Sequence, residues 1–312
     1  MPLKLFLRKT LTAWEASLFY LPTYLYYFFQ KNVPDLSENR YISVKNTLLS
    51  YLRNKKLDYT HYSLDKLKDN KKSDILFILG SSRFINDIPD NVWIKLKNYD
   101  TLGFNFWFYH HFAPTYYATE LGFTRLPGGK ENFLAAFNKR KNDYQDTIYL
   151  LTSRQRRRGF HPLLTPEYFP INPKVASFVS PKPIVCSLDR SFNKDNFRHG
   201  IYYRGSLNLY LHFALLMGFK KIVLVGCEMD SAIPFFEYFP ETQWMDEIYT
   251  FDPNREERLK TQYGGAYNNK NKHSLVNTIL AIDEFVFRPT GIELYVFNKK
   301  SLLYPKIPLY EF

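Results

Sequence analysis

The stretch SLNLYLHFALLMGFKKIVLVG, from Ser206 to Gly226, decides the fold. Its first half predicts a helix that ends at Gly218, because glycine adopts the left-handed conformation of a helix C-cap without strain. Its second half, residues 222–226, is a short continuous apolar run, which is typical of a strand covered on both faces. The helix, its short connection and the strand together form half of a βαβ unit.

Similar patterns occur on both sides of this stretch. The apolar run at residues 75–79 predicts a strand, and further strands are expected at residues 101–104, 147–151 and 184–187. A final helix is expected from about His273 to Phe287, followed by a strand at residues 292–297. This alternation predicts an α/β fold with a doubly wound, mostly parallel sheet and right-handed crossovers. Ligands of such sheets bind beyond the carboxyl ends of the strands.

The predicted elements divide the chain into four parts. We expect an aromatic-rich helical segment at residues 1–31, a connector at 32–73, the main domain at 74–303 with an insertion or small lid at about 110–200, and a tail at 304–312. The first segment carries Glu15 and Pro22 in its apolar run, so a helix lying in a membrane interface is preferred to a spanning one. Packing on the domain or on a second copy in a homo-oligomer is an equal alternative.

The formal net charge of +12 favours an anionic partner such as nucleic acid, an anionic membrane surface, or a phosphorylated or carboxylated substrate. No nucleic-acid-binding signature occurs, so we expect no nucleic-acid partner. The two cysteines, Cys186 and Cys227, lie in or after apolar runs, and the chain shows no secretory signal; both features predict a cytoplasmic protein. No histidine has the spacing of a metal ligand, and we expect no metal site.

Polar residues follow the predicted strands at the edge where a ligand would bind. Gly80, Ser81 and Ser82 could present N–H groups and hydroxyls to a phosphate or ribose, or form a plain turn. The Asn105 amide could bind a sugar or base, or satisfy its own turn. Ser206 is a natural N-cap, and an anion is favoured there, with Arg204 beside it; a cap alone is the other interpretation.

Three further groups are candidates. Glu228 and Asp230 could hold a ribose or an acceptor hydroxyl, and a divalent-ion role is a minority hypothesis. Arg154 and Arg157, in a basic run, could bind an anionic acceptor, a donor carboxylate or a membrane, or form a solvated basic face. His273 is expected at a helix N-terminus, which favours the neutral imidazole that accepts a proton; a structural histidine is the alternative.

The order of four segments resembles that of the bacterial sialyltransferases of glycosyltransferase family 42 and related polysaccharide-locus proteins. The segments are residues 77–82, 103–108, 204–228 and 273–303, and the likeness covers about residues 74–303. It implies a Rossmann-like domain, a GT-A-type variant, that binds a nucleotide sugar. The implied donor is a CMP-activated acidic sugar, and the implied transfer to a glycan or glycolipid acceptor inverts the anomeric centre without a metal or other cofactor.

The same resemblance assigns roles to residues. His273 would be the general base, and Asn105, Ser206 and the Gly80 loop would hold the nucleotide or its phosphate. The family loop reads Gly-Asn-Gly-Pro-Ser, whereas Ser81 and Ser82 stand at its second and third positions here. The family tyrosines that support the departing phosphate would fall near Asp230 and Phe236, so another tyrosine, such as Tyr267, would have to substitute.

The function expected from the resemblance is transfer of a sugar for capsule, lipopolysaccharide or another surface glycan, at the inner face of the cytoplasmic membrane. Two alternatives stay open. One is a phospho- or diphospho-transfer enzyme on a related scaffold, in which Glu228 and Asp230 would bind Mg²⁺. The other is a non-enzymatic membrane-peripheral binding protein.

Overall fold

Eight strands form one sheet in the computed structural model, which describes residues 59–118, 137–152, 173–178, 205–229, 235 and 274–312. Chain contacts divide the protein into residues 1–43 and 44–312, and all described residues belong to the second unit. The expected anchor at residues 1–31 and the expected strand at 184–187 lie outside the described residues. Within the described ranges, no helix is both long and apolar enough to span a bilayer.

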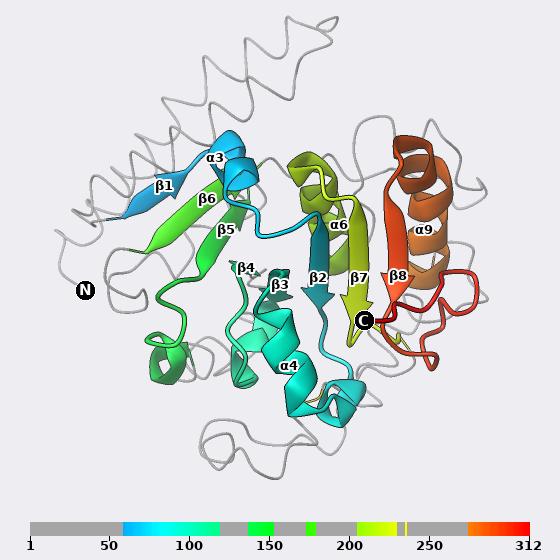
Figure 1. The fold of residues 1–312 in the computed structure, drawn as a ribbon, viewed down its shortest axis with the longest axis horizontal. Coiled ribbons are helices and arrows are strands. Elements are labelled where there is room, and N and C mark those ends of the chain that lie inside the picture. Colours follow the sequence, from blue (N-terminus) through cyan, green and yellow to red (C-terminus); the bar gives the residue numbers. More distant parts are fainter. Residues whose placement is uncertain (1–58, 119–136, 153–172, 179–204, 230–234, 236–273) are drawn as a thin grey trace, which may run out of the picture. The chain divides into compact units, whose positions relative to one another are not determined.

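Every neighbouring pair of strands in the sheet is parallel, which confirms the predicted α/β class (Figure 1). The order across the sheet is β1-β6-β5-β4-β3-β2-β7-β8. The strands are β1 (Thr60–Tyr62), β2 (Ile75–Leu79), β3 (Asp100–Phe104), β4 (Tyr116–Ala118), β5 (Ile148–Thr152), β6 (Lys174–Phe178), β7 (Lys221–Val225) and β8 (Glu293–Val296).

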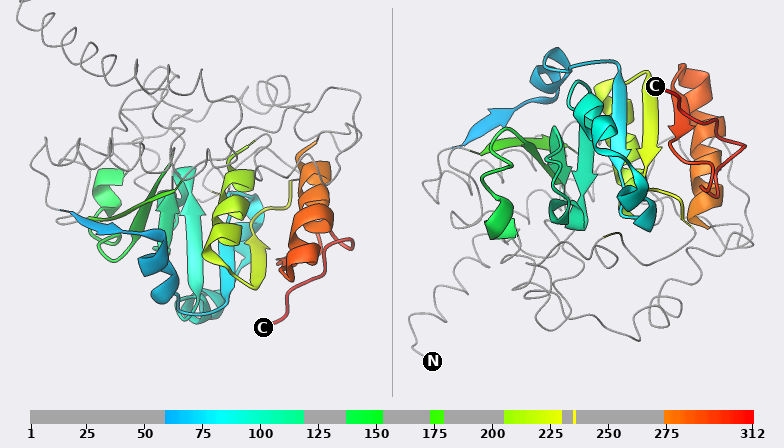
Figure 2. Two further views of the ribbon diagram at one scale, coloured as in Figure 1. Left: turned by 90° about the horizontal axis from the view of Figure 1, so that it is seen from above. Right: turned by 60° about the horizontal axis from the view of Figure 1, so that its bottom comes forward.

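Helices cover both faces of the sheet (Figure 2). Helices α3 (Leu64–Asp69), α6 (Ser206–Met217) and α9 (Leu275–Ile282) share one core with Leu76 and Ile78 of β2. Helix α4 (Asp90–Leu96) and the short 3₁₀ helices at Arg83–Asp87 and Asn105–Tyr109 share the other core with Phe77 and Leu79. Successive side chains of β2 therefore enter opposite cores, as the pleat of a strand requires.

The chain winds in opposite directions from the middle of this sheet. From β2 the next strand in sequence, β3, lies toward the β1 edge, whereas β7 is followed by β8 at the other edge. The helix after β2 covers one face, and the helices before and after β7 cover the other. This is the doubly wound arrangement, and its direction reverses between β2 and β7.

Five predicted strands, now β2, β3, β5, β7 and β8, agree with the structure to within one residue at each end. The helix predicted from Ser206 also matches α6, and its C-cap is Gly218 in the left-handed conformation with φ 69°. Part of the expected connector instead contains β1 and α3, and the expected insertion contributes β4, β5 and β6 to the sheet. The α-helical part of the final helix ends at Ile282. A π-helical turn at Asp283–Phe287 then continues it to the predicted end.

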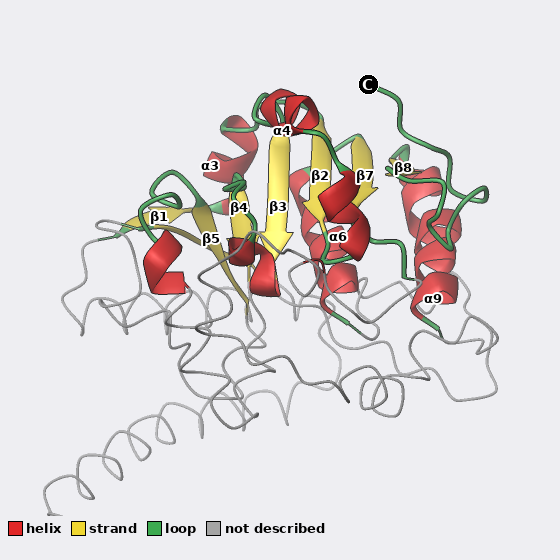
Figure 3. Cartoon of the chain, turned by 90° about the horizontal axis from the view of Figure 1, so that it is seen from below, coloured by secondary structure: helices red, strands yellow, loops and turns green. Residues whose placement is uncertain are grey.

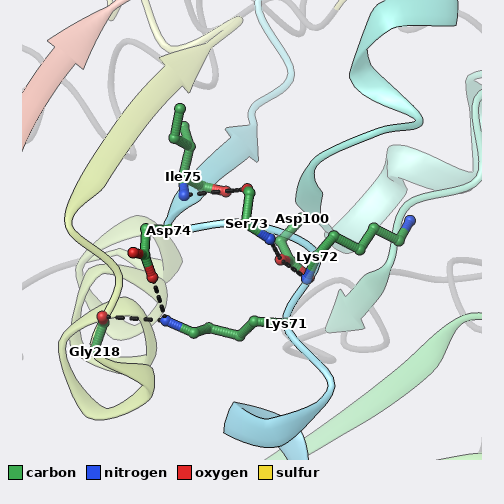
Figure 4. A network of polar contacts seen from close by, with 7 residues as sticks. All are labelled: Lys71, Lys72, Ser73, Asp74, Ile75, Asp100 and Gly218. Atoms are coloured by element: carbon green, nitrogen blue, oxygen red, sulfur yellow. Dashed lines mark hydrogen bonds and ion pairs between the residues drawn. The ribbon is translucent and has the colours of Figure 1, made fainter.

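The amino end of β2 is fixed by polar contacts (Figure 4). One oxygen of buried Asp100 accepts hydrogen bonds from the backbone N–H groups of Lys72 and Ser73, at 2.7 and 3.1 Å. Burial raises the pKa of Asp100 above its ordinary value of 3.8, and these hydrogen bonds oppose that rise. Lys71 pairs with Asp74 at 2.9 Å. These contacts hold the opposite end of the sheet from the candidate site.

Candidate functional site

The loops that follow β2, β3 and β7 meet at one edge of the sheet, where the arrowheads of these strands end (Figure 3). The winding direction reverses between β2 and β7, and in open α/β sheets the ligand crevice lies at this reversal. The candidate nucleotide-binding residues Gly80 and Asn105 directly follow β2 and β3, and Glu228 is the third residue after β7. The topology therefore gathers them at one edge.

The β2 and β7 loops are joined by backbone hydrogen bonds beyond the strand ends. The Gly80 N–H donates to the Val225 carbonyl at 2.7 Å, and the Ser82 N–H donates to the Gly226 carbonyl at 2.9 Å. A Cβ on Gly80 would lie 2.3 Å from the Gly226 oxygen and 2.5 Å from the Cys227 sulfur. Glycine is needed at position 80 because the two loops approach this closely.

The described contacts of the Gly80 loop support the turn interpretation. The N–H groups of Gly80 and Ser82, which we expected to face a phosphate, are used within the protein. The Ser82 hydroxyl caps the following 3₁₀ helix by accepting from the Phe84 N–H at 3.4 Å. Ser81 alone is exposed, and its carbonyl accepts from the Phe235 N–H at 2.8 Å. Gly80 and Ser82 thus build the turn, and Ser81 is the member of the loop that a ligand can reach.

Asn105 occupies an unusual backbone conformation directly after β3. Its φ is +55°, in the left-handed region, where asparagine is several-fold enriched among residues other than glycine. Such conformations cost about 1–3 kcal/mol and concentrate at functional sites. The chain therefore holds this residue in place at the expense of stability.

Helix α6 begins at Ser206, and its N-cap is Gly205. We predicted that Ser206 itself would be the cap, and the structure moves the cap by one residue. The reason is the backbone of Gly205, whose φ of 79° and ψ of 156° lie in a region that is essentially restricted to glycine. Ser206 is consequently the first residue of the helix.

The Asn105 side chain donates a hydrogen bond to the Ser206 hydroxyl at 3.3 Å. The two residues are 101 positions apart in the sequence, and both are half-buried. The contact places a carboxamide beside the start of α6, where the N–H groups of the first turn create a positive potential. Two residues that the resemblance assigns to the nucleotide are thus neighbours in space.

Tyr117 of β4 completes this arrangement, and sequence analysis did not identify it. Its hydroxyl donates a short hydrogen bond to the backbone carbonyl of Asn105. The side chain is only 1% exposed. A buried tyrosine in an aromatic-rich chain reads as core, so the sequence offers no pattern that distinguishes this one.

The β7 loop contains two left-handed residues, Gly226 with φ 66° and Met229 with φ 62°. Between them lies Glu228, which is 2% exposed. Its backbone carbonyl accepts from the Leu302 N–H at 3.0 Å and so ties the loop to the residues after β8. Burial, and then the charge of Glu228, raise the pKa of the Cys227 thiol, which keeps it in the inert protonated form. Glu228 is placed at the predicted edge, in a buried position.

The start of α9 lies next to the candidate base in the sequence. Ser274 is its N-cap, and the hydroxyl accepts from the Asn277 N–H at 3.1 Å. His273 precedes this cap and lies outside the described residues. The same is true of the other predicted contacts Arg154, Arg157, Arg204, Asp230, Phe236 and Tyr267. Within the described ranges, no group of three histidine, cysteine or acidic side chains could hold a metal ion.

Another histidine near this edge is not a candidate base. His110 follows the 3₁₀ helix after β3 and is packed between Trp93 and Trp107. Burial, and then the charges of His111 and Arg140, lower its pKa to about 2. Its Nδ1 accepts from the Phe112 N–H at 3.1 Å. His110 is a neutral structural group.

Comparison with known proteins gives weak similarity at the level of structure and none at the level of sequence. No family model matches the chain, and no curated protein matches its sequence. Among solved structures, the monofunctional alpha-2,3-sialyltransferase Cst-I from Campylobacter jejuni is similar at 16% identity and a TM-score of 0.39. The similarity covers 77% of this chain and 81% of that one. A match at this level does not establish a shared function.

The site combines features suited to binding rather than to redox or nucleophilic chemistry. Its described groups are a carboxamide, hydroxyls, the buried Glu228 carboxylate and a helix start, which can hold a polar or anionic ligand through directed hydrogen bonds. The one described thiol at this edge, Cys227, is buried.

Proposed function

We propose that this protein is a glycosyltransferase that binds a CMP-activated acidic sugar at the carboxyl edge of its sheet and transfers the sugar to a glycan or glycolipid acceptor. The observation that carries the proposal is the hydrogen bond between Asn105 and Ser206. The family resemblance assigns both residues to the nucleotide, and they could have been far apart in the fold. Their contact beside the reversal of the sheet gives that assignment a physical basis.

The chemistry of Asn105 and Ser206 suits a nucleoside monophosphate. A carboxamide both donates and accepts, so Asn105 can bind a ribose hydroxyl or the edge of a base. Helix α6 has no acidic residue in its first turn, and the N–H groups of a first turn, which lack partners within the helix, favour an anionic oxygen. The net charge of +12 adds a general attraction for an anionic donor.

The proposed reaction is a direct in-line displacement. The acceptor hydroxyl oxygen attacks the anomeric carbon of the donor from the side opposite the phosphate, and the bond from that carbon to the phosphate oxygen breaks. His273 takes the hydroxyl proton, and CMP leaves with the bonding electron pair. Asn105 and Ser206 hold the donor so that the three atoms lie in line, and this positioning supplies much of the rate.

Calorimetric titration with CMP, UDP, GDP and NAD tests the proposal. We expect CMP to bind most tightly, and we expect Asn105→Ala and Ser206→Ala to weaken CMP binding by about 5- to 100-fold, as the loss of one or two hydrogen bonds to a charged ligand implies. Asn91→Ala, which removes an exposed carboxamide from α4, is the matched control and should bind CMP normally. Equal affinity for all four nucleotides, or unchanged CMP binding in both site variants, would refute it.

Two further measurements, activity in the presence of a chelator and binding to liposomes, separate the alternatives. A phospho-transfer enzyme that uses Mg²⁺ would lose activity with a chelator, whereas the proposed transfer continues. A membrane-peripheral binding protein would bind anionic liposomes and no nucleotide, and would lose liposome binding when residues 1–31 are deleted.

A further inference from the structure

The left-handed conformation of Asn105 is supported by contacts with its surroundings. Asparagine enters this region more readily than most residues, and a residue other than glycine persists there when the surrounding structure supports it. A change of φ or ψ at Asn105 would rotate the carboxamide away from the Ser206 hydroxyl, which it now contacts at 3.3 Å. The geometry of the candidate site therefore depends on whatever fixes this peptide.

The Tyr117 hydroxyl contacts the Asn105 peptide. In the parallel ladder Tyr117 lies opposite Gly103, two residues before Asn105. Its hydroxyl reaches past the end of β3 and donates to the Asn105 carbonyl. The ladder sets the height of the tyrosine along the strand, so the hydroxyl is delivered from a fixed point.

The Tyr117 ring cannot easily move. It packs edge-on against Tyr144 and Tyr149, at centroid distances of 5.5 and 6.1 Å, and is stacked on Phe137 at 6.1 Å. All four rings are at most 2% exposed. Close-packed rings of this kind leave few alternative rotamers. The hydrogen bond to Asn105 is thus held by the core and not by a flexible side chain.

We infer that Tyr117 is a positioning residue, which holds Asn105 in its left-handed conformation so that the carboxamide is directed at Ser206 and at the ligand. Its effect on CMP binding rests on the proposed function. Its effect on Asn105 does not, because the hydrogen bond joins two residues of the chain itself.

Tyr117→Phe removes the hydroxyl and keeps the packed ring. Tyr144→Phe is the matched control, because Tyr144 is equally buried in the same group of rings and its hydroxyl makes no hydrogen bond with the part of the chain that the structure describes. We expect Tyr117→Phe to weaken CMP binding by about 5- to 30-fold, and Tyr144→Phe to leave it unchanged. Equal affinity in the two variants would overturn the inference.

A double-mutant cycle tests whether Tyr117 acts through Asn105. In an Asn105→Ala background, Tyr117→Phe should weaken CMP binding by less than twofold further, because the carboxamide that it positions is gone. Fully additive losses would mean that Tyr117 affects the ligand by another route and would also overturn the inference. Melting temperatures of all variants, measured in parallel, report any general loss of stability.

A nuclear magnetic resonance measurement is independent of the ligand. The side-chain amide signal of Asn105, assigned by its absence in Asn105→Ala, should shift or broaden in Tyr117→Phe and stay unchanged in Tyr144→Phe. If the wild-type protein binds no CMP, the proposed function fails while this signal still decides whether Tyr117 positions Asn105. An unchanged signal in Tyr117→Phe would reject the positioning role.

Discussion

At the scale of single residues, the candidate site is built from positions that are unfavourable by themselves. Asn105 and Met229 have positive φ, and both follow strands that end at the same edge of the sheet. For Met229 this conformation is a genuine outlier, because bulky side chains rarely adopt it. Among the described residues, backbone strain in residues other than glycine is thus confined to the loops where a ligand is expected, which is where strain is usually retained.

The residue that would carry the chemistry is His273, and its role is tested by His273→Ala. We expect transfer to fall by about 10²- to 10⁴-fold, because a positioned general base contributes that much. CMP affinity should stay within twofold of the wild type, since the proposed donor contacts are Asn105, directly after β3, and Ser206, at the start of α6. Steady-state rates and calorimetry on the same variant measure both. Transfer at the normal rate would remove His273 from the mechanism.

Sequence reasoning found part of this site. Asn105 and Ser206 were identified because a polar residue after a strand and a serine at a helix start are recognisable from pattern, and a family resemblance linked them. The hydrogen bond from Tyr117 could not be predicted, because it depends on the register between β3 and β4. The roles of Gly80 and Ser82 were also undecided, since only three-dimensional contact with the β7 loop shows that their N–H groups are used.

At the scale of elements, the β2 and β7 loops approach each other closely at Gly80. Gly80→Ala would place a methyl group 2.3 Å from a backbone oxygen, which cannot move aside as a flexible side chain can. We expect a loss of about 1–3 kcal/mol in the free energy of unfolding, the usual cost of overpacking. Urea denaturation measures it. Ser81→Ala, at the exposed neighbouring position, should change it by less than about 0.5 kcal/mol; equal effects of the two substitutions would contradict the steric account.

The elements that were predicted and those that were missed differ in length and burial. Strands β2 and β7 are continuous apolar runs between turn residues, so their bounds follow from the sequence. Strands β1 and β4 have three residues each, which is too short to show a period. Strand β6, KVASF, mixes polar and small residues and gave no prediction. All three strands depend on pairing with other strands, and for β1 the partner, β6, lies more than 100 residues later in the sequence.

At the scale of the whole molecule, buried histidines should make stability depend on pH. Burial lowers the pKa of His110 to about 2 and that of His212 to about 4, from an ordinary value of 6.5. Below pH 6.5, these two histidines therefore bind protons in the unfolded chain but stay unprotonated in the folded chain. Stability is fully present above about pH 6.5 and is lost as pH falls below it, by up to about 1.4 kcal/mol per pH unit for each group.

The comparison of wild type with His110→Asn isolates one of these groups. The asparagine oxygen can replace the Nδ1 acceptor of the Phe112 N–H and does not titrate. Urea unfolding at pH 7 and pH 5 should show a smaller loss of stability in the variant than in the wild type. The same loss in both proteins would show that His110 is not responsible.

The order of strands in the sheet has a consequence for how the chain acquires its structure. Strand β2 lies in the first third of the sequence, yet one of its two neighbours, β7, lies more than 140 residues later, as the pairing of Ile75 with Lys221 shows. Strand β1 likewise pairs with β6, which is synthesised much later. Pairings of such long range are slow to form, because the loop must close before the contacts stabilise it. During synthesis, the edge of β2 that pairs with β7 therefore stays unpaired until nearly three quarters of the polypeptide has been made. An unpaired strand edge is prone to aggregation, so we expect the nascent chain to need protection over that interval.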